Sequence, residues 1–172
     1  MIATFYAAVV FTIVASALCS LLEAFILSTT PTEIESLKEK APKRGEMLEK
    51  FRREIEETSS AILSLNTIAN TAGASFAGAL FVTAFRDGNV TYYTIAMTVS
   101  ILLFSEIIPK NIGVLYRPAL QAYLVYPLAA IRIAMWPISR LASVAVKVIS
   151  RGKQADAETS DTDIIMMARK SA

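Results

Sequence analysis

Three long stretches without a charged side chain constrain this sequence more than any other feature. They cover residues 1–22, 58–85 and 88–105. Each stretch reaches or exceeds the roughly 18 residues that an α-helix needs to cross a hydrocarbon core about 30 Å thick. Charged residues make up 19% of the 172 positions, so their exclusion from these stretches favours an integral membrane protein over a soluble domain.

We therefore expect an all-α membrane protein with three transmembrane helices, at about residues 2–30, 58–85 and 90–109. Residues 31–57 are highly charged, with apolar residues at near-helical spacing and breaks at Pro42 and Gly45, which predicts a helical hairpin in water. Lys and Arg in this loop and after residue 109 place both regions in the cytoplasm by the positive-inside rule. The N-terminus and a tight turn at 86–89 then lie outside.

Residues 118–149 leave two interpretations open. Their longest uncharged run, 118–131, is short for a span and is interrupted by Pro127. Trp136, Arg132 and Arg140 suit the headgroup region, so we expect juxtamembrane helices on the cytoplasmic side, with a fourth span as the alternative. Residues 1–150 form one membrane domain in this interpretation. The polar residues 151–172 form a connector, the start of a truncated cytosolic region.

Several chemistries lack the residues that they require. Without histidine there is no Ser-His-Asp or Cys-His nucleophile system and no zinc site of the usual kind. The single cysteine, Cys19, forms no intramolecular disulfide and is expected to pack between helices. A hydrolase that uses Ser105 and Lys110 is disfavoured because water and Glu106 at the span end keep the lysine protonated. We expect no enzymatic activity and, without a basic stripe, no nucleic-acid partner.

Each predicted span carries polar side chains that are costly in lipid. They are Ser16, Ser20 and Glu23 in the first span, Asn66 and Asn70 in the second, and Glu106 at the end of the third. Pro109 has no N–H and so releases the carbonyl of Ser105 beside Glu106. Carboxylate, amide, hydroxyl and carbonyl oxygens are the ligands that hard cations such as Mg²⁺ prefer. The pattern predicts a site for a hard divalent cation.

Structural interpretations of the same residues stay open beside the functional one. Asparagines in membrane helices often bond to a neighbouring helix, and serines often bond to a carbonyl of their own helix. Glu106 and Lys110 are spaced as an ordinary i, i+4 ion pair. Ala69, Gly73 and Ala77 form a stripe of small residues that serves either packing within one subunit or a dimer seam.

Three segments resemble a known family in their order and spacing. They are SLLEA at 20–24 with Ser28, LNTIANTAGA at 65–74, and SEIIPK at 105–110. They resemble the transmembrane domain of the cyclin M (CNNM)/CorC family over about residues 5–150. The resemblance implies a homodimer with three spans and a belt of juxtamembrane helices, and a role in Mg²⁺ export driven by sodium influx. It also implies a cytosolic CBS-pair domain in the full-length protein, which this chain lacks.

The resemblance assigns roles to individual residues. The implied cation ligands are Ser20, Glu23, Asn66, Asn70 and Glu106, while Gly73, Ser105, Pro109 and Lys110 shape the site. The leading hypothesis is a plasma-membrane transporter that takes Mg²⁺ from the cytoplasm and releases it outside by alternating access, coupled to Na⁺. The alternative is a non-transporting membrane anchor that senses Mg²⁺ and signals to a cytosolic domain or partner.

Overall fold

The structure is a computed structural model that describes residues 1–86 and 88–150. Every regular element in these residues is a helix, which confirms the all-α prediction. Helix α1 (Ile2–Ser28) corresponds to the first charge-free stretch and α4 (Ile55–Ala84) to the second. The predicted connector at 151–172 lies outside the described residues.

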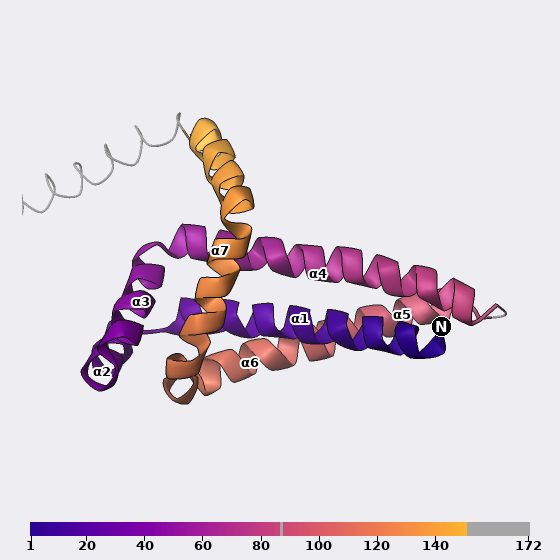
Figure 1. Ribbon diagram of the computed structural model, residues 1–172, viewed down its shortest axis with the longest axis horizontal. Coiled ribbons are helices and arrows are strands. Elements are labelled where there is room, and N and C mark those ends of the chain that lie inside the picture. The colour runs from indigo at the N-terminus through magenta and orange to yellow at the C-terminus, as the bar shows by residue number, and fades with distance from the viewer. Residues whose placement is uncertain (87, 151–172) are drawn as a thin grey trace, which may run out of the picture.

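The third charge-free stretch forms a helix in three consecutive parts. They are α5 (Val90–Ser100), the π-helical segment η1 (Ile101–Ile107) and α6 (Ile108–Leu115). In Figure 1, α1, α4 and the α5–η1–α6 run lie lengthwise beside one another. Helix α1 packs against α4 on one side and against η1 and α6 on the other. The three predicted spans therefore exist as helices with α1 in contact with both of the others.

A cluster of aromatic rings closes the end of the molecule where α1 begins. Phe81 stacks on Tyr93 with ring centroids 4.8 Å apart, and Phe5 packs against both rings and Phe85. The Tyr93 hydroxyl also donates a hydrogen bond to the carbonyl of Ala74 at 3.1 Å. These contacts link α1, α4 and α5 beside the predicted short turn between α4 and α5.

The charged loop forms the predicted helical hairpin, α2 (Pro31–Lys40) and α3 (Pro42–Arg53). Pro42 begins α3, as a residue without an N–H can. The predicted break at Gly45 is wrong, because Gly45 lies inside α3. A Cβ atom on Gly45 would lie 2.5 Å from Lys38 Cγ. This glycine therefore lets the two helices approach rather than ending one of them.

Residues 117–150 form one long helix, α7 (Arg117–Ser150), which continues through Pro127 and Pro137. More than one juxtamembrane helix was expected at about 118–149, whereas the structure has one continuous helix there. Figure 1 shows α7 running across the direction of α1 and α4, and it packs mainly on α4. In the described residues, four helical stretches are long and apolar enough to span a membrane, including Arg117–Ile138. Length and composition therefore do not confirm the count of three spans.

One hydrophobic core joins the second half of α1 and the first half of α4 to α2, α3 and α7. Leu22, Phe25, Leu48, Ile62 and Leu128 are completely buried there. Cys19 is 1% exposed in the same core, as expected for a residue that packs between helices. The other half of the molecule exposes many large apolar side chains, as surfaces in contact with lipid do.

Candidate cation site

Polar side chains of α1 and α4 meet in the buried contact between these helices. Ser16 Oγ donates a hydrogen bond to Asn66 Oδ1 at 2.7 Å, and both residues are buried. Asn70 Nδ2 donates to the same Asn66 oxygen at 3.5 Å. Three polar residues from the predicted polar faces therefore form one cluster. The interhelical hydrogen bond also confirms the structural interpretation of Asn66. The ligand role of Asn66 stays a prediction beside it.

Small residues on α4 explain why the two helices approach so closely. A Cβ atom on Gly73 would collide with Thr12 Oγ1, one helical turn from the Ser16–Asn66 bond. Ala77, one turn further along α4, is completely buried. The stripe of small residues thus serves packing within one chain at these positions, as one of the two open interpretations held.

The other side of α1 carries an ion pair between two helices. Lys110 Nζ in α6 lies 3.2 Å from Glu23 Oε2, while the two side chains are 48% and 20% exposed. Lys110 therefore pairs with α1, and the Glu106–Lys110 ion pair, the structural alternative that the spacing left open, is not formed. Glu106 is partly buried and makes no side-chain hydrogen bond or ion pair with the residues that the structure describes.

The predicted disturbance near Pro109 takes the form of the π-helical segment η1. The N–H of Ile108 donates to the carbonyl of Leu103, five residues back, and Pro109 follows at the start of α6. Ser105 within this segment is completely buried, and its Oγ donates to the carbonyl of Ile13 in α1 at 3.1 Å. Single π-helical turns occur frequently at functional sites. The missing N–H of Pro109 was the sequence signal, but the change of helix type was not predicted.

Gly113 sets the distance between α6 and α1, which the sequence analysis missed. A Cβ atom at this position would lie 2.5 Å from the carbonyl oxygen of Leu21. Its sequence signal is a glycine inside a helical pattern, which costs stability unless packing requires it. This close approach places Lys110, three residues earlier, within reach of Glu23.

Two predicted site residues have buried oxygens that lack a hydrogen-bond partner in the part of the chain that the structure describes. They are Ser20 Oγ and Asn70 Oδ1. Ser59 Oγ in α4, outside the predicted set, shares this property. Buried polar atoms are nearly always paired in folded proteins, so each exception calls for an explanation. A bound cation is one such explanation for a buried oxygen.

The contacts arrange the predicted residues at different levels along α1. Ser105 contacts Ile13, Asn66 contacts Ser16, and Lys110 contacts Glu23. Because an α-helix rises 1.5 Å per residue, Ser16 and Glu23 are separated by about 10 Å along its axis. The neutral cluster thus lies at one level and the charged pair at another, nearer the core formed with α2, α3 and α7.

The described residues contain no cluster of three or more histidine, cysteine or acidic side chains placed to hold a metal. A cation bound between these helices would depend on neutral oxygens supplemented by single carboxylates. Hard cations accept such mixed sets, and Mg²⁺ retains several of its own water ligands when protein ligands are few. The ligand set of Ser20, Glu23, Asn66, Asn70 and Glu106 stays a prediction.

Comparison with known proteins extends the resemblance over almost the whole chain. The family described as cyclin M transmembrane N-terminal domain matches residues 7–172. A chloroplastic DUF21 domain-containing protein of Arabidopsis thaliana is 25% identical over 158 residues, which are 90% of this chain and 24% of that protein. A UPF0053 protein of Synechocystis sp. is 24% identical over 162 residues, 94% of this chain and 46% of that protein.

The chain thus spans less than half the length of these curated relatives. The family match, however, includes α1, the charged hairpin, α4, the third span and α7. Together with helices long and apolar enough to span a bilayer, it establishes a multi-pass membrane protein. The chain belongs to the cyclin M transmembrane domain family.

Proposed function

We propose that this domain transports Mg²⁺ out of the cytoplasm by alternating access, coupled to Na⁺ influx. The observation that carries the proposal is that two buried oxygens, Ser20 Oγ and Asn70 Oδ1, have no hydrogen-bond partner within residues 1–86 and 88–150. They lie on the two helices that the Ser16–Asn66 bond joins. Such oxygens can replace part of the hydration of a hard cation. Membership of the cyclin M family supports magnesium as the cargo, and the direction and Na⁺ coupling rest on the resemblance.

The proposed ligands act in succession along α1. Glu23 and Ser20 lie on the side of the hydrophobic core and would receive the cation first, after which Asn66, Asn70 and Glu106 would hold it deeper in the bilayer. Carboxylates supply the charge that compensates a divalent ion, and amide oxygens supply neutral ligands. Transport requires no covalent step, so the domain is proposed to be a non-enzymatic carrier.

Lys110 controls access to the first carboxylate in this proposal. Its ammonium lies 3.2 Å from Glu23 and neutralises it when no cation is bound. A cation that binds Glu23 must displace this ammonium, and movement of Lys110 would shift α6 and the adjoining π-helical segment that holds Glu106. The Glu23–Lys110 ion pair is thereby proposed to couple cation binding at Glu23 to the position of α6 and of the π-helical segment that holds Glu106.

The proposed topology places the N-terminus outside and α2, α3 and the C-terminus in the cytoplasm of the cell, in its plasma membrane. Lys and Arg residues concentrated in α2 and α3 support this orientation. The direction of α7 across α1 and α4 in Figure 1 favours a helix that lies along the cytoplasmic interface, which keeps three spans. As the family resemblance implies, the transporter is proposed to be a homodimer whose full-length chain carries a CBS-pair domain.

A flux assay in sealed proteoliposomes tests the proposal. Asn70→Ala should abolish most of the Mg²⁺ flux seen with the wild-type chain under an opposing Na⁺ gradient. Asn111→Ala is the matched control, because Asn111 is exposed and, among the described residues, its side chain bonds only to the carbonyl of Ile107, four residues earlier. Equal flux in the two variants would remove Asn70 from the pathway.

The same preparation separates the transporter from the membrane anchor that senses Mg²⁺. Mg²⁺ binding by calorimetry and Mg²⁺ flux are measured on one batch of protein. A transporter both binds and moves the ion. Binding without flux, under Na⁺ gradients of either direction, would favour the anchor.

A further inference from the structure

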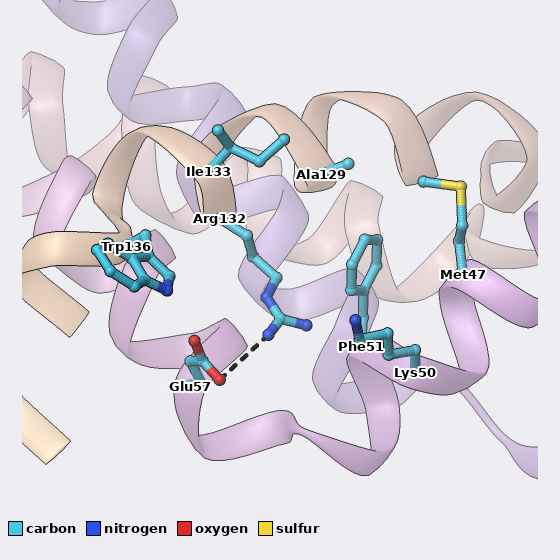
Figure 2. Close-up of a pocket in the computed structure, with 8 residues that line it drawn as sticks. All are labelled: Met47, Lys50, Phe51, Glu57, Ala129, Arg132, Ile133 and Trp136. Carbon is cyan, nitrogen blue, oxygen red and sulfur yellow. Dashed lines mark ion pairs between the residues drawn. The ribbon is translucent and has the colours of Figure 1, made fainter. Parts of the chain in front are cut away.

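A cavity of about 540 Å³ opens between α3, the first turn of α4 and α7. Its walls are largely apolar and include Met47 and Phe51 from α3 and Ile133 and Trp136 from α7. Figure 2 shows Met47 and Trp136 at opposite ends, with Arg132 between them and pointing from α7 toward Glu57. The volume lies in the range of sites that bind small organic molecules.

Arg132 is the polar centre of this cavity. Its side chain is 11% exposed, and Nη2 lies 2.6 Å from Glu54 Oε2 and 3.2 Å from Glu57 Oε2. The guanidinium carbon is 5.1 Å from the centre of the Phe51 ring. The other terminal nitrogen, Nη1, is buried and has no hydrogen-bond partner among the described residues. Two carboxylates and an aromatic ring thus hold the guanidinium in place.

The sequence places this cavity at the level of lipid headgroups. Glu57 is the last charged residue before the charge-free stretch 58–85, so the cavity lies where α4 leaves water for lipid. Trp136 at its end stacks under the Arg140 guanidinium, 4.5 Å from the ring centre, an arrangement that suits the aromatic and basic belt of a membrane interface. Its occupant therefore combines a headgroup with an acyl chain.

We propose that this cavity binds an anionic phospholipid. Three cationic side chains, Lys50, Arg53 and Arg132, act on Glu54, so three positive charges stand beside the two carboxylates of Glu54 and Glu57. This excess favours a negatively charged headgroup. The apolar walls favour a lipid over free phosphate, which would leave them without a partner. Basic pockets between membrane helices on the cytoplasmic side bind anionic headgroups in this way.

The lipid is bound at both of its ends. Its phosphate oxygens accept hydrogen bonds from the ammonium of Lys50, an exposed residue of the lining, while the Arg132 guanidinium adds a positive charge. Its acyl chain passes over Ile133 and Trp136, which are 78% and 50% exposed. Bound lipid would connect the hairpin, the start of α4 and α7, so the site links membrane composition to the arrangement of these helices.

Trp136, the single tryptophan of the chain, provides a direct readout. The complete chain in nanodiscs of phosphatidylcholine is mixed with increasing fractions of phosphatidylglycerol with brominated acyl chains, which quench tryptophan at contact. Brominated phosphatidylcholine is the comparison lipid. Phosphatidylglycerol should reach half-maximal quenching at a fraction about fivefold lower. Equal quenching by the two lipids would overturn the proposal.

Three variants separate a defined site in the cavity from general attraction of anionic lipid to a basic surface. Lys50→Gln should remove most of the preference for phosphatidylglycerol, while Lys43→Gln, an exposed position in the same helix and outside this cavity, should keep it. Ala129→Phe fills the cavity and should remove the preference without changing a charge. Equal losses in the two lysine variants, or full preference after Ala129→Phe, would contradict a site in the cavity.

A further experiment distinguishes a site for a phospholipid from a site for free phosphate. Inorganic phosphate is added at millimolar concentration to nanodiscs that contain brominated phosphatidylglycerol. The proposal expects the quenching of Trp136 to persist, because phosphate does not replace the acyl-chain contacts. Complete reversal of the quenching would identify a free-phosphate site and overturn the lipid proposal.

Discussion

The two sides of α1 hold its neighbours by different chemistry. Toward α4 the contact is neutral, with Ser16 bonded to Asn66 and Gly73 packed against Thr12. Toward η1 and α6 the contact includes the charged pair of Glu23 and Lys110 as well as the Ser105 hydroxyl. Neutral hydrogen bonds between buried groups depend little on ion concentration, whereas a partly exposed charge pair responds to competing ions. The α4 side therefore suits fixed ligands, and the α6 side suits a responsive contact.

The two glycines at these contacts face different obstacles. Gly73 faces the side chain of Thr12, while Gly113 faces the backbone carbonyl of Leu21. A side chain can rotate away from an added group, whereas a backbone inside a helix moves only with the whole helix. A larger residue should therefore be tolerated better at Gly73 than at Gly113.

Gly113→Val should have the largest effect of the changes considered. The added side chain meets the Leu21 carbonyl 2.5 Å from its first carbon, so α6 must separate from α1. We expect a loss of about 3 kcal/mol or more in the free energy of unfolding, measured by denaturation in detergent micelles. Gly78→Ala is the control, because its Cβ would lie 3.4 Å from the Tyr93 ring. If both variants lose the same stability, the backbone contact does not set the distance between α1 and α6.

Gly73→Ala should lower the free energy of unfolding by less, about 2 kcal/mol, because the Thr12 side chain can move away from the added carbon. Combining it with Thr12→Ala removes the two side-chain atoms closest to the added carbon and should recover part of this loss. Stability is measured for both single variants and the pair as a double-mutant cycle, which isolates the coupling between contacting residues. Additive losses would show that Gly73 does not set the approach of α4 through Thr12.

Much of this arrangement follows from local rules that the sequence displays. The exclusion of charge predicts α1, α4 and the third span, and residues spaced four apart predict the shared faces of Ser16 with Ser20 and of Asn66 with Asn70. The pairing of faces between helices depends on packing over the whole interface. For that reason the sequence left a Glu106–Lys110 pair open as the structural alternative and did not predict the Glu23–Lys110 pair, which the close approach at Gly113 allows.

The proline positions also show that local sequence rules do not predict the effect of packing. A proline inside a helix removes one backbone hydrogen bond and is normally a break signal. Pro127 nevertheless lies inside continuous α7, with Leu124, Val125 and Leu128 buried in the core around it. Burial of this face stabilises the helix beyond what local propensity indicates. Tertiary packing of this kind is not visible in the spacing of prolines and apolar residues.

Lys110→Gln should change Mg²⁺ binding more than it changes the free energy of unfolding. An exposed ion pair contributes at most about 1 kcal/mol, so unfolding should change little. Under the proposed function, the same change frees the Glu23 carboxylate, and Mg²⁺ should bind up to about fivefold more tightly in calorimetric titrations. Lys110→Arg keeps the competing charge and should bind as the wild type does. Equal affinities in the two variants would exclude competition between Lys110 and Mg²⁺.

The smallest expected effect concerns pH at a charged contact away from α1. A hydrogen bond from Arg132 lowers the pKa of Glu54 from its ordinary value of 4.5. A lowered pKa in the folded state means that this contact stabilises the fold fully above pH 4.5 and loses its effect as the pH falls through the lowered pKa. Because the Glu54 side chain is partly exposed to solvent, the change should be a few tenths of a kcal/mol, measured by unfolding across pH 3 to 6.

Glu54→Gln isolates this contribution from that of the other carboxylates. The variant should be slightly less stable than the wild type near neutral pH and should approach it in acid, since a protonated glutamate and a glutamine are then equally uncharged beside Arg132. Glu56→Gln, an exposed neighbour in the first turn of α4, should keep the wild-type acid profile. A constant difference between Glu54→Gln and the wild type at every pH would mean that the ionised carboxylate of Glu54 adds nothing to the attachment of α7, and that Glu57 alone holds Arg132.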